Sequence, residues 1–338
     1  EVTELTSATT GSDVADQVGK GIVGFSSGFQ GLGPDVVILL GDRYEILAAA
    51  IAAFFVGIPL VHLHGGEVTH GAFDDTIRHS ITKFAHIHGV AAEEYAERVI
   101  RAGEPPESVH VIGGLGVDEI LSTDLLSRKE LQDSLGLDLG RPVFLATYHP
   151  VTAGTHNSSE EIKSLIFALD SFPGATVVFT MPGADPEHKV ISDGIAKAVA
   201  ARAPNWHFVA SLGQQRYLSL VALASAVVGN SSSGLLEAPT LKTPTVNIGS
   251  RQQGRLMASS VVQADPTTTD IIRALEHALS PDFQEVVAKT VNPYGTGGAV
   301  DKIMKILEET DFSRLGQKIY HDELWQTKVE GHGEPPFG

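Results

Sequence analysis

The chain has 338 residues, of which 42% are hydrophobic and 19% charged, and its 41 acidic side chains outnumber its 24 basic ones. The net charge of -17 argues against nucleic acid as a partner, because binding to a phosphate backbone depends on clustered Lys and Arg. The absence of Cys excludes disulfides, thiolate catalysis and Cys-ligated zinc, and it is compatible with the reducing cytoplasm in which we expect the protein to work.

The most apolar part of the sequence, residues 46–61, raises the question of a membrane span. It falls short of the roughly 20 residues that a helix needs to cross a bilayer, and Gly57 and Pro59 divide it into an Ala-rich helix and a strand. Residues 1–10 lack the basic start and the apolar core of a signal peptide. We therefore predict a buried helix leading into a buried strand, and no membrane partner.

Short apolar runs alternate with amphipathic stretches, which is typical of a parallel sheet with helices on both faces. The predicted strands cover residues 35–40, 59–64, 86–92, 108–114, 142–149, 175–181, 206–211, 225–230, 243–249 and 259–264. The predicted helices include residues 45–55, 74–84, 93–102, 158–170, 186–203 and 268–279. Almost every strand runs into Gly, Ser, Asn, Asp or His at its carboxyl end, the edge at which doubly wound sheets bind ligands.

The length suits two domains, and we place their boundary within residues 135–143, where a helix ends in Gly-rich polar sequence and a buried strand begins. The predicted domains are residues 1–138 and 139–311, and the second includes a final amphipathic helix after the turn "NPYGTGG". Residues 312–338 form a predicted tail with at most one packed helix near residues 320–325. The predicted fold class is α/β, with two doubly wound domains that face each other across a cleft.

The first candidate site is the stretch "GDRYE", which follows the strand at residues 35–40. Asp42 lies at the tip of this strand, with Arg43 and Glu45 close by. A carboxylate at this edge suits catalysis, and the alternative is that Asp42 only caps the helix that follows.

The second candidate site lies in "VHLHGGEVTHGAFDDTIRH", residues 61–79, where we expect only one of His62 and His64 to reach the site. The Gly65–Gly66 turn lets the backbone approach a ligand, and Glu67 follows at once. Further along, Asp74 and Asp75 begin a helix on which Arg78 follows at i+4 and i+3. Three carboxylates and a His within such a short stretch suit general acid and base work.

A metal site is the rival interpretation of this stretch. The possible ligands are His64, Glu67, His70, Asp74 and Asp75. Their spacing matches no standard zinc pattern such as HExxH, so we predict acid and base chemistry without a metal. A pair of helix-capping Asp residues with solvated His side chains is the third alternative.

The third candidate site begins where the strand at residues 225–230 breaks into "GNSSSG" and opens a helix. Backbone N–H groups, hydroxyls and the positive helix end meet there, which predicts an anion site. The sequence is neither a Walker A loop nor a GxGxxG turn, and Ser-rich capping without a ligand is the alternative. Glu237 lies within reach of a ribose, Arg251 and Arg255 can add positive charge to a diphosphate, and His149 ends the strand at residues 142–149.

Six motifs resemble those of the hydrolysing UDP-N-acetylglucosamine 2-epimerases, in the same order and over nearly everything from Pro34 to about Leu307. They are "GDRYEILAAA", "HLHGGEVTHGAFDDTIRHSITK", "ATYHPVT", "GNSSSGLLEAP", "NIGSRQQGR" and "NPYGTGGAV". The "HLHGGE" form is similar to the branch that acts on UDP-2,4-diacetamido-2,4,6-trideoxyhexoses such as UDP-N,N'-diacetylbacillosamine in nonulosonic (sialic or legionaminic) acid synthesis. The resemblance implies a GT-B architecture, with the nucleotide held by the second domain.

The resemblance also implies a reaction. A base takes the C2 proton while UDP leaves C1, which gives a glycal; water then adds to C1, and C2 is reprotonated on the other face. No cofactor is expected. The implied partner is a UDP-sugar, and a homo-oligomer (dimer or tetramer) is expected.

The resemblance implies catalytic roles for Asp42, Asp74 and His149, and for either His64 or Glu67, because some members carry Glu where this chain has His64. The residues assigned to substrate binding are Arg43, Arg78, Asn230, Ser231, Ser232, Ser233, Gly234, Glu237, Arg251 and Gln252.

Members of the family begin with a strand and an Arg-containing loop that nothing before Glu1 supplies, so we expect the first domain to lack its first strands. Two alternatives to the epimerase are a UDP-sugar sensor without turnover and a GT-B glycosyltransferase.

Overall fold

The computed structural model describes residues 11–69, 73–151, 157–183, 187–315, 318, 320 and 321. Their contacts form two compact units. Unit 1 comprises Glu1–Gly114 with Gly298–Gly338, and unit 2 comprises Leu115–Gly297.

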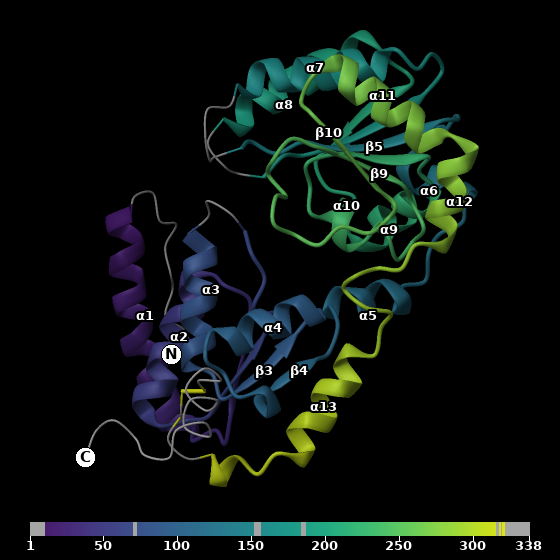
Figure 1. Cartoon of the computed structure of the whole chain (residues 1–338). Helices are drawn as coiled ribbons and strands as arrows, with labels where there is room; N and C mark the ends of the chain where they lie inside the picture. The colour runs from purple at the N-terminus through teal and green to yellow at the C-terminus, as the bar shows by residue number, and fades with distance from the viewer. Residues whose placement is uncertain are drawn as a thin grey trace, which may run out of the picture. The chain divides into compact units, whose positions relative to one another are not determined.

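Unit 1 is built on a parallel sheet whose strands follow each other in chain order. The strands are β1 (Val37–Leu40), β2 (Leu60–Leu63), β3 (Ile87–Val90) and β4 (Val109–Val111). One helix connects each strand to the next, namely α2 (Tyr44–Val56), α3 (Phe73–Phe84) and α4 (Glu93–Arg101) (Figure 1). The carboxyl ends of β1 and β2 are therefore neighbours, and the polar stretches that follow them meet at one edge.

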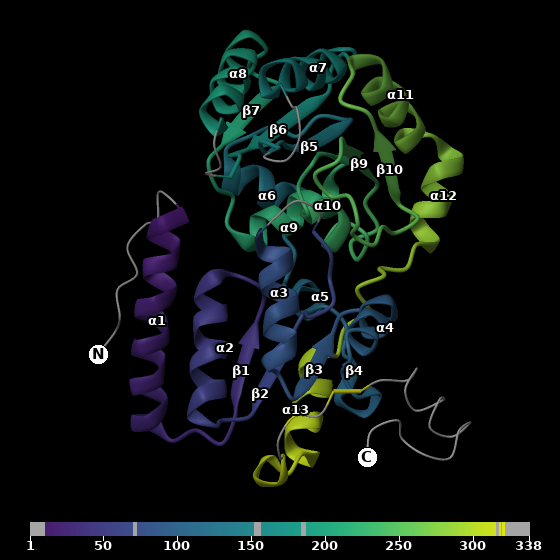
Figure 2. The ribbon, with the colours of Figure 1, turned by 60° about the vertical axis from the view of Figure 1, so that its left-hand side comes forward.

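The Ala-rich segment is a helix followed by a strand, as predicted. Five alanines of α2 are buried, and β2 is buried throughout. A 22-residue helix, α1 (Gly11–Leu32), packs along α2 (Figure 2). A Cβ at Gly21 of α1 would lie 3.0 Å from the Cβ of Ala48, so this glycine permits the close approach of the two helices. Within the part of the chain that the structure describes, no helix combines the length and the apolar character needed to cross a bilayer.

Unit 2 contains a six-stranded parallel sheet in the order β10-β9-β8-β5-β6-β7. The strands are β5 (Val143–Thr147), β6 (Thr176–Thr180), β7 (Trp206–Val209), β8 (Ala226–Gly229), β9 (Thr245–Ile248) and β10 (Val261–Ala264). The order reverses between β5 and β8. In such folds this reversal is the point at which ligands bind, at the carboxyl ends of the two strands.

Helices cover both faces of this sheet. Phe144 and Ala146 of β5 pack with α7 (Ser158–Asp170), α8 (His188–Ala201) and α11 (Thr268–Leu279), which lie together in Figure 1. Val143 and Leu145 face a second core with α6 (Arg128–Leu135) and α9 (Gln214–Leu223). The alternation along β5 is that of a strand buried on both faces, as in a doubly wound sheet.

All ten predicted strands are present, and the predicted helices at residues 158–170 and 268–279 match α7 and α11 to the residue. The predicted helix at residues 186–203 is α8, although residue 186 lies outside the described residues. Helices α1 and α9 were not predicted, nor were α5 (Leu115–Ser122) and α12 (Pro281–Lys289). Tyr320 and His321 are not helical, and the rest of the expected helix near residues 320–325 is not among the described residues.

The compact units do not coincide with the proposed domains 1–138 and 139–311. Packing groups α5 and α6 with unit 2, and it groups the final helix α13 (Ala299–Glu309) with unit 1, where Lys302 donates to the backbone oxygen of Ile112 (3.3 Å). The short helical turn at Phe312–Arg314 and residues 318, 320 and 321 also belong to unit 1.

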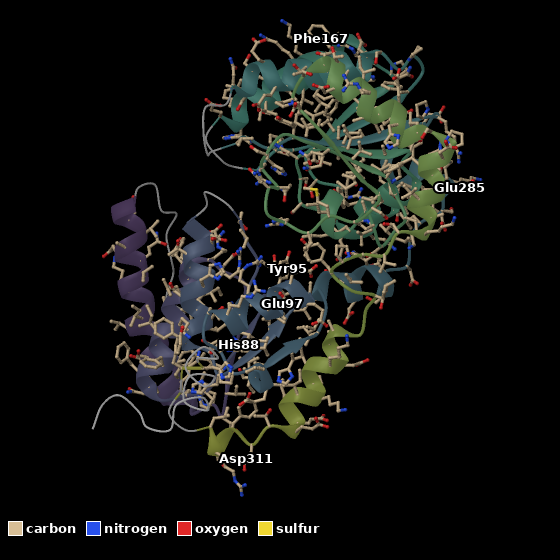
Figure 3. The ribbon with its side chains drawn as sticks, viewed as in Figure 1. His88, Tyr95, Glu97, Phe167, Glu285 and Asp311 are labelled. Atoms are coloured by element: carbon tan, nitrogen blue, oxygen red, sulfur yellow. The ribbon has the colours of Figure 1, made fainter. Side chains whose placement is uncertain are left out.

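A buried ion cluster joins the end of the chain to the sheet of unit 1. Glu104 follows α4 and is 0% exposed, and it contacts Lys83 of α3, His88 of β3 (3.1 Å) and Lys318 (2.6 Å). His88 is labelled on its strand in Figure 3. Burial would raise the pKa of Glu104, but hydrogen bonds from His88, Lys318 and Lys83 outweigh it and lower the pKa to about 2.

We predict that Glu104→Gln lowers the free energy of unfolding by about 3 kcal/mol, because two lysines lose their buried counter-charge. Thermal denaturation at pH 7 measures the loss. Glu97→Gln is the matched control, since Glu97 pairs with Arg101 in water, and it should change little.

The same cluster predicts a pH dependence. The folded pKa of Glu104 lies below the ordinary value of 4.5, so its stabilisation is complete above pH 4.5 and is lost as the pH falls toward 2. The difference between wild type and Glu104→Gln should therefore shrink between pH 5 and 3. A constant difference over this range would contradict the assignment.

Candidate functional site

In unit 1, the carboxylate of Asp42 follows β1 directly. Gly41 has φ +89°, a conformation that glycine adopts without strain, and it turns the chain out of the strand. The N-cap of α2 is Arg43, which makes no side-chain capping bond, so the alternative that Asp42 caps this helix is wrong. Arg43 itself is exposed and pairs with Glu45 (2.9 Å). This bond is the first cause of the raised pKa of Arg43.

Arg78 is the centre of the polar cluster in unit 1. Its side chain is 3% exposed, and one guanidinium nitrogen donates to Asp42 Oδ2 and to the hydroxyl of Thr69 (3.2 Å). The other nitrogen donates to Asp75 Oδ1 (3.2 Å) and to the backbone oxygen of Glu67 (2.8 Å). Arg78 therefore ties together β1, α3 and the turn after β2.

The predicted i, i+3 ion pair between Arg78 and Asp75 is present. Across the described residues, the ion pairs of Arg78 are with Asp42 and Asp75, and not with Asp74 as the i, i+4 spacing had suggested. The pKa of Asp74 is raised, first by partial burial and then by the neighbouring Asp42 carboxylate. The cluster thus holds two nearby carboxyl groups in different environments, an arrangement suited to acid and base chemistry.

His64 and Glu67, the two candidates between which the sequence did not choose, form one ion pair. Strand β2 ends at Leu63, and His64 adopts φ +64°, which is uncommon for a residue with a side chain. Its N–H donates to Gly89 O (2.8 Å), and its Nδ1 lies 2.8 Å from Glu67 Oε1. The side chains of His64 and Glu67 are 22% and 12% exposed.

His62 is fully buried on β2, whereas His64 remains partly exposed. His70, one of the possible metal ligands, is not among the described residues. No group of three or more His, Asp or Glu side chains in the described ranges is arranged to hold a metal ion.

In unit 2, Asn230 and His149 lie at the two strand ends where the sheet order reverses. Asn230 is 0% exposed, and its side-chain amide accepts from His149 N (2.7 Å) and donates to His149 O (2.8 Å). Its backbone N–H donates to Thr147 O (3.1 Å). The amide of Asn230 therefore serves as a support for His149, although the sequence had suggested a direct substrate contact.

The contacts of His149 determine which ring nitrogen carries a proton. Gly183 N–H donates to His149 Nδ1 (2.8 Å), and a backbone N–H cannot accept in return. Nδ1 therefore presents its lone pair, and the proton of the neutral ring lies on Nε2. His149 is arranged to donate a hydrogen bond through Nε2.

The serine-rich loop leads into only one turn of helix, α10 (Ser233–Leu236). Ser232 occupies the N-cap position and makes no side-chain capping bond. Glu237 is the C-cap residue, so it does not lie within the helix as expected. One turn has a small dipole, and an anion here would depend on the local N–H groups and on charged side chains.

Two predicted anion contacts meet at the backbone of Asn230. Gln252 is buried and donates from Nε2 to Asn230 O (2.8 Å), and Arg251 Nη1 lies 3.3 Å from the same oxygen. Both side chains are thereby placed beside the serine-rich loop, within unit 2.

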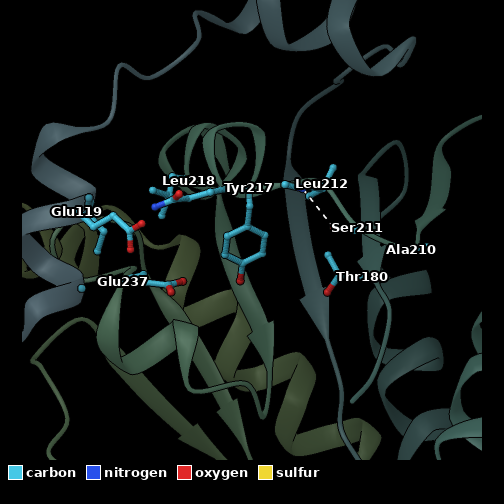
Figure 4. Close-up of a pocket in the computed structure, with 12 residues that line it drawn as sticks. Glu119, Thr180, Ala210, Ser211, Leu212, Tyr217, Leu218 and Glu237 are labelled. Carbon is cyan, nitrogen blue, oxygen red and sulfur yellow. Dashed lines mark hydrogen bonds between the residues drawn. The ribbon is translucent and has the colours of Figure 1, made fainter. Parts of the chain in front are cut away.

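Next to this loop is a pocket of about 440 Å³, lined entirely by residues of unit 2 (Figure 4). Tyr217 O–H donates to Ser233 Oγ (2.6 Å), which in turn donates to Glu237. Burial raises the pKa of Glu237, and burial raises the pKa of Tyr217 to about 12. The chain Tyr217–Ser233–Glu237 therefore fixes a carboxyl group at the pocket wall.

Sequence reasoning missed three lining residues, Tyr217, Glu119 and Thr180. Thr180 ends β6 and bonds Thr147 at the end of β5 (2.5 Å), so the rule that ligands bind at strand ends could have found it. Glu119 and Tyr217 lie on α5 and α9, which were not predicted, and no motif marks them.

The sequence matches the model of the family described as UDP-N-acetylglucosamine 2-epimerase over residues 2–308. The chain belongs to this family. A relative from Campylobacter jejuni, named GDP/UDP-N,N'-diacetylbacillosamine 2-epimerase (hydrolyzing), is 41% identical over 261 residues, which are 77% of this chain and 67% of the relative. A Legionella pneumophila relative, named UDP-N,N'-diacetylbacillosamine 2-epimerase (hydrolyzing), is 34% identical over 88% of this chain and 77% of the relative.

Solved structures agree on the fold of this family member. The crystal structure of UDP-GlcNAc 2-epimerase from Neisseria meningitidis bound to UDP-GlcNAc has a TM-score of 0.76 and 19% identity, and the match covers 91% of this chain and 84% of that one. The predicted GT-B architecture with two Rossmann-like domains is thus confirmed.

We predict that Asn230→Asp destabilises this epimerase-family chain by about 2 kcal/mol, because a carboxylate oxygen replaces the donor that faces His149 O. Thermal denaturation of the variant against Asn205→Asp, whose side chain is exposed, measures the effect. Equal melting temperatures for the two variants would show that the amide of Asn230 does not support His149.

Proposed function

We propose that the protein is a hydrolysing UDP-sugar 2-epimerase, which converts a UDP-2-acetamidohexose to the free 2-epimer and UDP. The observation that carries the proposal is the Arg78 cluster, in which a buried cation holds Asp42 and Asp75 beside Asp74 at one sheet edge. Two relatives that are named hydrolysing 2-epimerases support it.

The reaction requires removal of a weakly acidic proton. As the bond between C1 and the diphosphate oxygen breaks, its electron pair leaves with UDP and positive charge develops at C1, which makes the C2 proton removable. Loss of that proton gives a double bond between C1 and C2. Water then adds hydroxyl to C1, and C2 receives a proton on the opposite face. Carboxylates near the ring stabilise the charge at C1 in the transition state.

The two carboxyl groups near Arg78 suit the two proton transfers. Asp42 is paired with a buried cation and acts as the base, while the raised pKa of Asp74 makes it the group that returns a proton. The ion pair of His64 and Glu67 lies at the end of the neighbouring strand and orders the added water. Arg78 is fully engaged by protein groups and acts by positioning the carboxylates.

Unit 2 is proposed to hold the nucleotide. The backbone of Ser231–Gly234 and the Arg251 guanidinium receive the diphosphate, and the Glu237 carboxylate accepts from ribose hydroxyls. His149, with its proton on Nε2, donates to the oxygen that leaves C1. Electrostatic stabilisation of the departing UDP makes early cleavage of the C1 bond possible.

The finer proposal is that the sugar is a 2,4-diacetamido-2,4,6-trideoxyhexose used in nonulosonic acid synthesis. Both relatives are named for the diacetylbacillosamine substrate. The Campylobacter relative is named for GDP as well as UDP, so the base is part of the question. A homo-oligomer stays a prediction.

Incubation with UDP-sugars in deuterated water tests the proposal by proton NMR. We predict release of UDP and of a free sugar with deuterium at C2, fastest with the diacetamido substrate and slower with UDP-N-acetylglucosamine or a GDP-sugar. Retention of the nucleotide on an epimerised sugar would indicate the non-hydrolysing reaction. Binding without turnover would favour a sensor, and turnover only with an added acceptor would favour a glycosyltransferase.

Asp42→Asn should reduce C2 exchange at least about 100-fold, because it removes the base. Its UDP affinity, measured by titration calorimetry, should stay within about twofold of wild type, since the proposed nucleotide contacts lie in unit 2. Asp35→Asn is the matched control, because Asp35 is exposed at the other end of β1. Exchange that survives in Asp42→Asn would remove Asp42 from the base role.

A further inference from the structure

His62 is a buried histidine that no step of the proposed reaction uses. It is 0% exposed on β2, and its Nε2 lies 3.0 Å from the backbone oxygen of Gly41, the residue before Asp42. Its Nδ1 lies 3.2 Å from Thr82 Oγ1 on α3, the helix that carries Arg78. One ring thus links two of the segments that carry the carboxylates.

A third segment rests on the same pair of side chains. A Cβ at Gly65 would lie 3.1 Å from His62 Nδ1 and 3.2 Å from Thr82 Oγ1, closer than most real Cβ contacts. The turn that leads to Glu67 therefore lies directly against this pair. Gly65 is needed here for close approach, which is a more specific reason than turn flexibility.

The proton positions in this contact follow from the partners. A carbonyl oxygen only accepts, so His62 Nε2 carries the proton that bonds Gly41 O. Burial lowers the pKa of His62 to about 3, and the charges of His88 on β3, Arg78 on α3 and His64 also oppose a second proton. The ring is neutral, and Nδ1 presents a lone pair.

The lone pair on Nδ1 requires a donor, and the Thr82 hydroxyl is the group in reach. Arg78 O lies 3.1 Å from the same hydroxyl. That oxygen belongs to a helix, where the backbone N–H four residues later can satisfy it. The hydroxyl proton is therefore available to His62.

We propose that His62 and Thr82 form a positioning pair that fixes the three segments bearing Asp42, Glu67 and Arg78 relative to one another. The pair touches neither sugar nor nucleotide. Gly41 is held to β2 at both ends, by its N–H to Leu63 O (3.3 Å) and by its carbonyl to His62. The orientation of the next residue, Asp42, is thereby fixed. The kinetic part of this inference rests on the proposed epimerase function.

Variants at Thr82 test the pair by kinetics. Thr82→Val keeps the shape and removes the donor, and it should lower kcat about 10-fold or more with KM within about twofold, because small misplacement of reacting groups is costly. Thr82→Ser keeps the hydroxyl and should restore kcat to near wild type. Ser80→Ala is the matched control, since Ser80 also contacts the carbonyl four residues earlier but is not in contact with His62. Equal kcat for Thr82→Val and wild type would overturn the proposal.

Nitrogen NMR of the wild-type protein with labelled histidine tests the pair without any substrate. We expect His62 to show a protonated Nε2 and a bare Nδ1, unchanged from pH 5 to 9. A proton on Nδ1, or titration near pH 6.5, would overturn the proposal even if the variants fail to fold. An inactive wild type would instead overturn the proposed function, and the NMR result would then decide on the pair alone.

Discussion

The buried charge of Arg78 is the constraint on which the organisation of unit 1 depends. A guanidinium taken out of water is costly unless carboxylates and carbonyl oxygens surround it, and removal of one partner leaves an uncompensated charge. Asp42, Asp75 and the backbone of Glu67 provide that surrounding. They come from three separate segments, so satisfaction of one cation brings the acidic groups together. The repulsion among these acids is offset by the same charge.

Unit 2 uses a neutral device for the same purpose. The Asn230 amide holds both backbone polar groups of His149 across the point where the sheet order reverses, and Gly183 fixes the proton of the imidazole on Nε2. An amide suits this place because it offers one donor and one acceptor without charge. The serine-rich loop and Arg251 then lie beside the same residue. In the proposed reaction, unit 1 supplies groups that transfer protons, while unit 2 supplies groups that stabilise the departing diphosphate.

Sequence patterns predicted the strands well because each buried strand is a short apolar run that ends in small or polar residues. Helix α7 was predicted to the residue, since its N-cap Asn157 and the acidic residues of its first turn mark its start. Helix α1 was missed because its many glycines are typical of loops, each costing about 1 kcal/mol in a helix. Packing against the small side chains of α2 compensates for that cost, and such packing is visible only in three dimensions.

The predicted site was recovered by its chemistry more than by its partners. Strand ends pointed to Asp42 and His149, but spacing within one helix suggested Asp74 as the ion-pair partner of Arg78, and the structure instead pairs Arg78 with Asp42 from a different strand. His62, Tyr217 and Glu119 carry no motif, and their importance arises from contacts between segments distant in sequence.

The central claim is that the charge of Arg78 sets the electrostatics of the acidic cluster. Carbon NMR titration of the Asp74 carboxyl in wild type, Arg78→Lys and Arg78→Met measures it directly. Since Arg78 lowers the pKa of Asp74, the midpoint should move to higher pH in Arg78→Met and stay closer to wild type in Arg78→Lys. An unchanged midpoint in a folded Arg78→Met protein would contradict the account.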